Sequence, residues 1–168
     1  MIQTTLYKLC ISLSILFTSI VSAQIVTETS LWESKQIDDV YLLKIKSNVD
    51  LLEALNDFST TKDINHAIVQ GSGDVLNVVL SNDANTKLKK MKSNINLTSL
   101  TGSLTLIDGI RTWDIKGTLS SNNLKAFTGT IKDAKVNDRV ELYVYEIDQK
   151  VHRTTDNLQT KAVFDFTK

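Results

Sequence analysis

Hydrophobic and polar residues follow two different periods along this chain, and the change of period separates its predicted elements. Val40–Lys46 (VYLLKIK) is a short apolar run typical of a strand. After it, Ser47 and Asp50 match the Ser-x-x-acid capping pattern, and leucine and phenylalanine side chains recur at helical spacing. We therefore predict a strand followed by one helix over Val49–Thr60.

Beyond the helix the period is two, which is typical of strands. The glycines Gly71 and Gly73 predict a tight turn or bulge with unusual backbone angles, and Asp108-Gly109 predicts a hairpin turn. Gly102 lies within a regularly alternating strand, which a lysine-rich loop precedes. The predicted strands are His66–Gln70, Asp74–Ser81, a run from Leu97, Ile110–Leu119, Leu124–Ile131 and Arg139–Ile147. The sum is an α+β fold, a largely antiparallel β-sheet with packed helices.

The N-terminal segment has the pattern of a targeting sequence. Lys8 precedes the mostly apolar run Leu9–Ile20, and the small residues of Val21–Ala23 follow. This order predicts a secretory signal peptide over residues 1–23. The apolar run has about 12 residues, whereas a membrane span needs about 20. We therefore expect an exported protein, periplasmic or secreted, with no membrane span after cleavage.

The remaining chain divides into three parts. Residues 24–39 are polar and weakly patterned, and we interpret them as a lead-in segment anchored by Leu31 and Trp32. Residues 40–147 carry the predicted helix and strands and form one domain. Residues 148–168 are a polar C-terminal tail.

Composition narrows the possible chemistry. The chain has 19 Lys and Arg against 19 Asp and Glu, 42% hydrophobic residues and no proline. Its single cysteine, Cys10, lies in the signal peptide, so the mature chain has no disulfide or thiolate site. The two histidines, His66 and His152, match no nucleophile-elbow or zinc-protease motif, and we read His66 as structural. We expect no enzyme activity and no cofactor, although a Ser, His and Asp arrangement formed only in space stays open.

The order of these elements resembles the plants-and-prokaryotes-conserved domain, called PPC or PCC. The resemblance covers Val40–Ile147. Its most specific parts are the Gly71-x-Gly73 turn and the Ser99–Leu104 strand before Asp108-Gly109. It implies a compact α+β fold that assembles as a homotrimer. Plant members are DNA-binding regulators, so the resemblance also raises DNA binding.

Many prokaryotic members of this family bind a metal through a His-x-His-x-His run and a later histidine. In this chain the corresponding positions are Thr112, Asp114, Lys116 and Thr130. None is histidine, and the lysine ammonium repels a cation while offering no imidazole nitrogen. We therefore predict that the family metal site is absent.

The same residues allow two interpretations without the family. Thr112, Asp114 and Lys116 share one face of a strand, which in a half-solvated sheet faces water. Alternatively, they form a polar pocket at a subunit boundary, in which Lys116 receives an anionic group of an unknown small ligand. Both interpretations stay open at this point.

Nucleic-acid binding is the remaining alternative. Lys87, Lys89, Lys90 and Lys92 concentrate positive charge, and phosphate contacts supply most nonspecific affinity for DNA. Removal of residues 1–23 leaves a net charge of about −1, and no proline is present to complete an AT-hook. We expect a non-enzymatic binding or structural module and place DNA binding second.

Overall fold

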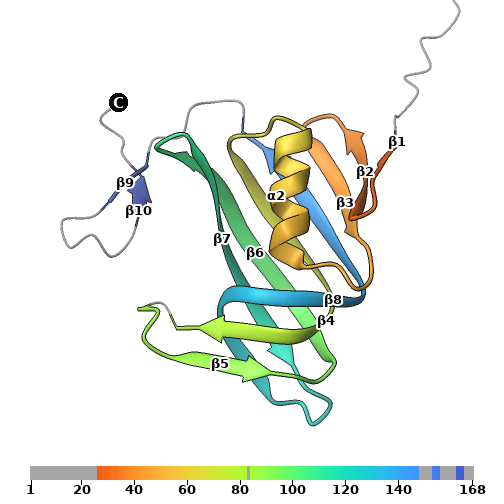
Figure 1. Cartoon of the computed structure of the whole chain (residues 1–168), viewed down its shortest axis with the longest axis vertical. Coiled ribbons are helices and arrows are strands. Elements are labelled where there is room, and N and C mark those ends of the chain that lie inside the picture. The colour runs from red at the N-terminus through yellow and green to blue at the C-terminus, as the bar shows by residue number, and fades with distance from the viewer. Residues whose placement is uncertain (1–25, 83, 148–152, 156–161, 165–168) are drawn as a thin grey trace, which may run out of the picture.

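The computed structural model describes residues 26–82, 84–147, 153–155 and 162–164. The predicted signal peptide and His152 lie outside these residues. The described chain is mainly β, with one α-helix, α2 (Leu51–Thr61), lying against an eight-stranded antiparallel sheet (Figure 1). None of the described helices has the length and apolar character of a membrane span. The antiparallel sheet is confirmed, and the described residues include one helix packed against it.

The sheet runs in the order β1-β2-β3-β8-β7-β6-β4-β5, and β4 also pairs with β8. The chain of pairings from β4 through β6, β7 and β8 therefore returns to β4, so these four strands close into a ring. A separate antiparallel pair is formed by β9 and β10. The strands are β1 (Val26–Glu28), β2 (Trp32–Ile37), β3 (Val40–Ile45), β4 (Ala67–Ser81), β5 (Leu88–Met91), β6 (Ile95–Ile107), β7 (Ile110–Ser120), β8 (Ala126–Glu146), β9 (Arg153–Thr155) and β10 (Ala162–Phe164).

The helix begins one turn later than the capping pattern predicts. Asp50 has extended backbone angles, and its carboxylate accepts a hydrogen bond of 2.8 Å from the backbone N–H of Glu53. Asp50 is therefore the N-cap, and Ser47 is not. Apolar side chains from one stripe of α2 are buried against the sheet, namely Leu51, Ala54, Leu55 and Phe58.

The expected lead-in segment contributes β1 and β2 to the sheet. Trp32 is fully buried, as its role as an anchor predicted. Its ring meets that of Phe58 edge to face with centroids 5.2 Å apart, and its indole N–H donates to Asp57 Oδ2 at 2.8 Å. Tyr41 packs on the other edge of Phe58, with ring centroids 5.4 Å apart. These contacts fasten β2, β3 and α2 together.

In two places, a pair of strands predicted as separate forms one continuous strand. The segments around Gly71 and Gly73 form the single strand β4, with a register shift between the two glycines. Neither glycine has a positive φ, so the expectation of unusual backbone angles is wrong. The glycines are required by close approach instead, because a Cβ at Gly71 would lie 2.9 Å from Leu142 Cα and one at Gly73 would lie 2.7 Å from Val140 Cα. The segments Leu124–Ile131 and Arg139–Ile147 likewise belong mostly to one long strand, β8.

The hairpin at Asp108-Gly109 is confirmed. Both residues have positive φ, 50° and 78°, as a two-residue turn with the twist of the adjoining strands requires. The turn joins β6 to β7, whose register pairs Ile107 with Ile110. At Gly102, in the middle of β6, an added Cβ would lie 2.5 Å from the carbonyl oxygen of Asp114 on β7. The hairpin thereby fixes the register of the strand that carries the candidate metal-site positions.

Candidate functional site

The four residues at the family's metal positions lie together on one face of the sheet. Thr112, Asp114 and Lys116 alternate along β7, and all three side chains are exposed. Lys116 is directly opposite the half-buried Thr130 on β8. Directly opposed residues of an antiparallel pair place their Cβ atoms about 4.5–5.5 Å apart, so Lys116 and Thr130 can contact one molecule.

Strand β6 extends this polar face on the other side of β7. Its register sets Thr101 opposite Lys116, Ser103 opposite Asp114 and Thr105 opposite Thr112. Thr105 is buried, so the resulting surface offers the hydroxyl groups of the other residues, one carboxylate and one ammonium. It lacks imidazole, and the described residues include no group of three or more His, Cys, Asp or Glu side chains suited to a metal ion. These residues do not fit a zinc site, because hydroxyl and ammonium groups do not replace imidazole ligands.

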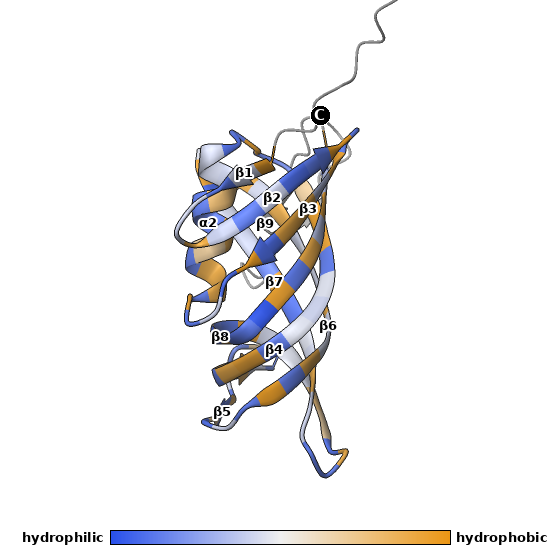
Figure 2. Cartoon of the chain, turned by 90° about the vertical axis from the view of Figure 1, so that its right-hand side faces the viewer, coloured by the Kyte–Doolittle hydropathy of each residue, from blue (hydrophilic) through white to orange (hydrophobic). Residues whose placement is uncertain are grey.

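Next to the polar face, the same side of the sheet carries exposed apolar side chains. Ile68 on β4 is 51% exposed, Tyr143 on β8 is 50% exposed and Leu42 on β3 is 36% exposed. The registers set Leu42 opposite Tyr143 and Ile68 opposite Tyr145, so the four side chains are contiguous. We call Leu42, Ile68, Tyr143 and Tyr145 the apolar patch. Figure 2 shows the hydrophobic and hydrophilic bands that alternate along these strands.

His66, interpreted from the sequence as structural, lies just before β4. It is half-buried, and its backbone carbonyl accepts a hydrogen bond of 2.9 Å from the N–H of Ile147. Nearby, Arg111 donates from Nε to the carbonyl of Ile64 at 2.9 Å and pairs with Asp63. These contacts tie the chain before β4 to the β6–β7 hairpin.

The lysine-rich segment is not simply a loop. Leu88–Met91 forms β5, an edge strand that pairs with the end of β4. Lys89 is opposite Leu80 and Lys90 is opposite Val79, so the two lysines project from opposite faces. The cluster of positive charge seen in the sequence is therefore divided between two surfaces.

A cavity that was not predicted from the sequence lies between β5 and the start of β8. The cavity has a volume of about 370 Å³. The Lys89 side chain from β5 reaches the Phe127 ring at the start of β8, with the lysine Nζ 4.0 Å from the ring centroid. The alternation of lysines and the isolated phenylalanine were visible in the sequence, but their meeting depends on the course of β8.

The fold and the candidate site can be compared with those of known proteins. The described chain is an α+β domain that combines an antiparallel sheet closed around its long strands with a helix, a Gly-x-Gly bulge and an Asp-Gly hairpin. The family model of the Plants and Prokaryotes Conserved (PCC) domain matches residues 33–148. The chain belongs to this family, as the resemblance in its sequence predicted.

Solved structures share the fold at low sequence identity. A candidate DNA-binding protein from Bacteroides thetaiotaomicron is 20% identical and superimposes with a TM-score of 0.78, covering 83% of this chain and 100% of its own. A plant- and prokaryote-conserved protein from Pyrococcus horikoshii is 20% identical, with a TM-score of 0.69 and coverage of 84% and 99%. A metal-containing protein from Archaeoglobus fulgidus is 19% identical, with a TM-score of 0.68 and coverage of 81% and 99%. No curated protein matches the chain.

Proposed function

We propose that this chain is an exported, non-enzymatic PPC-domain protein that assembles as a homotrimer and acts as a binding or structural module. The observation that carries the proposal is the apolar patch, because contiguous exposed apolar side chains mark interaction surfaces. Two of its members, Ile68 and Tyr143, leave about half of their side-chain surface in water. Burying the patch against a second copy of the chain removes that surface from water.

Sedimentation equilibrium on the mature chain tests the assembly. We expect the mass of a trimer at micromolar concentration. Ile68→Glu and Tyr143→Glu each place a charge in the patch and should shift the mass to that of a monomer. The matched control is Leu124→Glu, because Leu124 is 90% exposed in the turn before β8 and lies outside the patch. A wild-type monomer at micromolar concentration contradicts the proposal.

A second candidate function is binding of a small anionic ligand on the polar face beside the patch. It is favoured by the direct opposition of Lys116 and Thr130, with Asp114 two residues along the same strand face. A neighbouring subunit over the patch would enclose this face. A thermal-shift screen of small organic anions should then find a ligand whose effect Lys116→Ala removes and Lys44→Ala leaves intact. An equal effect of the two variants contradicts a site at Lys116.

DNA binding by the lysines is less favoured. The proteins from Bacteroides thetaiotaomicron and Ralstonia eutropha that share the fold are described as candidate DNA-binding proteins. In this chain the lysines of β5 project from two opposite faces, which divides the charge that a DNA backbone would require on one surface. We expect no mobility shift of duplex DNA at physiological salt. A shift that persists as salt rises would reverse this ranking.

Two further experiments test the expected absence of a metal and the proposed export. Elemental analysis of the purified protein should find no stoichiometric zinc, because the four metal positions hold no imidazole. Expression of the full chain in its natural host, followed by fractionation and N-terminal mapping, should find a mature protein that begins at Gln24. Zinc at one equivalent per chain, or a cytoplasmic protein that retains residues 1–23, contradicts the respective expectation.

A further inference from the structure

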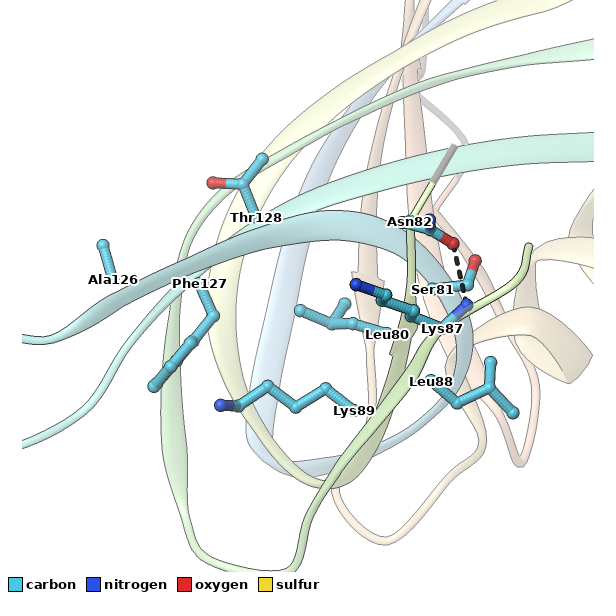
Figure 3. Close-up of a pocket in the computed structure, with 9 residues that line it drawn as sticks. All are labelled: Leu80, Ser81, Asn82, Lys87, Leu88, Lys89, Ala126, Phe127 and Thr128. Carbon is cyan, nitrogen blue, oxygen red and sulfur yellow. Dashed lines mark hydrogen bonds between the residues drawn. The ribbon is translucent and has the colours of Figure 1, made fainter. Parts of the chain in front are cut away.

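The cavity between β5 and β8 has the dimensions of a small-molecule site. Its volume of about 370 Å³ lies at the lower end of the range of about 300–1,000 Å³ for ligand pockets. Figure 3 shows that three segments surround it: the end of β4 with the turn after it, β5, and the start of β8. The residues that line it are Leu80, Ser81, Asn82, Lys87, Leu88, Lys89, Ala126, Phe127 and Thr128.

The inner part of the cavity is apolar. Leu80 is 3% exposed and Phe127 is half-buried against the core. Beside Leu80, Ser81 is also buried, and its hydroxyl donates to Asn85 Oδ1 at 2.9 Å. A ligand that enters the cavity therefore meets a hydrocarbon and aromatic surface.

The rim of the cavity is positively charged. In Figure 3 the side chains of Lys87 and Lys89 extend toward β8, and Lys89 Nζ lies next to the Phe127 ring. A cation over an aromatic face is attracted by the ring, which holds the Lys89 ammonium at the cavity. The nine lining residues that the structure describes include no Asp or Glu. Two ammonium groups thus meet an apolar surface without a carboxylate among the lining side chains.

The neighbouring lysine provides a contrast. Lys90 projects from the opposite face of β5, where Val79 pairs with both Lys90 and Asp133. Burial raises the pKa of Asp133, as do the hydrogen bond and charge of Asp50, and the positive charge of Lys90 partly opposes that rise. Lys90 therefore has an acidic neighbour on its own face and does not line the cavity.

We propose that this cavity binds a small organic anion in which a carboxylate is attached to an aromatic or alkyl body. The carboxylate pairs with Lys89 and Lys87, and the apolar body packs on Leu80 and Phe127. A nucleic-acid backbone is a poorer match, because phosphate contacts would leave the apolar surface unused. The cavity and the apolar patch lie toward opposite ends of β4 and β8, so this proposal does not depend on trimer formation.

Calorimetric titration of the full chain with naphthalene-2-carboxylate, at physiological salt, tests the site. We expect saturable binding of one molecule per chain. Lys89→Gln keeps most of the side-chain length, removes the charge and should weaken binding at least tenfold. Lys90→Gln removes the same charge from the same exposed strand and should change the affinity less than twofold.

A neutral probe and a second variant test the two halves of the recognition separately. Naphthalene-2-methanol retains the aromatic body without the carboxylate and should bind at least tenfold more weakly. Phe127→Leu should weaken binding of naphthalene-2-carboxylate while circular dichroism shows the wild-type fold. Absence of saturable binding to the wild-type chain, equal losses in Lys89→Gln and Lys90→Gln, or binding of the alcohol as tight as that of the acid would overturn the proposal.

Discussion

Gly71 is a position at which adding one methyl group should strongly destabilise this fold. Gly71 lies in β4 opposite Leu142 of β8 and opposite Leu100 of β6. A Cβ built there lies 2.6 Å from Leu142 Cδ2 and 2.9 Å from Leu142 Cα, and the carbonyl oxygen of Glu141 is closer still. Ordinary contact begins at 3.4 Å, so the backbone of β8 must move away in Gly71→Ala.

The cost of that movement has two parts. Overpacking of a tight interior costs about 1–3 kcal/mol. Displacing β8 also weakens its hydrogen bonds to β4, and a buried backbone group left unsatisfied costs about 1–3 kcal/mol more. We therefore expect Gly71→Ala to lower the free energy of unfolding by about 2–6 kcal/mol, a large part of the total of about 5–15 kcal/mol that is usual for a domain.

Gly109 is the matched control, because glycine is favoured there by a positive φ and not by close packing. Its φ is 78°, and a Cβ there meets nothing within 4 Å. Gly109→Ala should therefore cost only about 1–2 kcal/mol, the strain of a left-handed backbone. Urea unfolding followed by circular dichroism measures both losses. Either of two results would refute this account. One is a Gly71→Ala variant whose unfolding free energy lies within 1 kcal/mol of the wild-type value. The other is a Gly109→Ala variant that loses as much unfolding free energy as Gly71→Ala does. Failure of Gly71→Ala alone to fold would agree with this account.

Three further predictions concern the helix, a buried tyrosine and the N-terminal strands. Asp50→Ala should lower the unfolding free energy by about 1 kcal/mol in urea titrations, whereas Ser47→Ala should change it by less than about 0.5 kcal/mol; the reverse order would return the cap to Ser47. Burial, with the charge and hydrogen bond of Glu146, raises the pKa of Tyr41 above its usual value of 10.0, so the unfolded chain ionises first and stability falls as pH rises past 10. In Tyr41→Phe, urea titrations between pH 9 and 11 should show a smaller fall, and an unchanged fall would contradict this role. Trp32→Ala should cost about 3–5 kcal/mol by circular dichroism, and a loss below 1 kcal/mol would mean that β2 is dispensable.

The features predictable from the sequence are those with a local physical cause. The stripe of α2 and the turn at Asp108-Gly109 each depend on residues within a few positions of one another, and both are confirmed. The cap was misplaced because Ser47 and Asp50 both carry capping side chains, and the backbone angles at Asp50 decide between them.

The features that were missed depend on distant partners. Residues 132–138 (KDAKVND) show no clear period, because along this stretch β8 changes from pairing with β7 to pairing with β3 while β4 stays beside it. Only Ala134 and Val136 are fully buried there. Because this stretch lacks a clear period, the sequence predicted two separate strands where the structure has the single strand β8.

The candidate sites likewise combine a part that the local sequence pattern predicts with a part that depends on residues distant in sequence. The alternation along β7 was enough to group Thr112, Asp114 and Lys116 on one face. The family resemblance added Thr130, which the structure sets opposite Lys116. The cavity was not predictable, because Lys89 and Phe127 are far apart in the sequence and meet only when β5 and the start of β8 lie on the two sides of β4.

The position of β8 in the ring of strands has a consequence for how the chain acquires its structure. β8 is the last strand of the main sheet, yet β3, β4 and β7 all depend on it for a neighbour. A nascent chain that ends before Ala126 leaves edges of these strands unpaired, and the contact between Ala67 and Glu146 closes only at the end. Contacts so distant in sequence make folding slow, and they place it after synthesis of the domain is complete. The ring of strands can therefore close only after Glu146 has been synthesised.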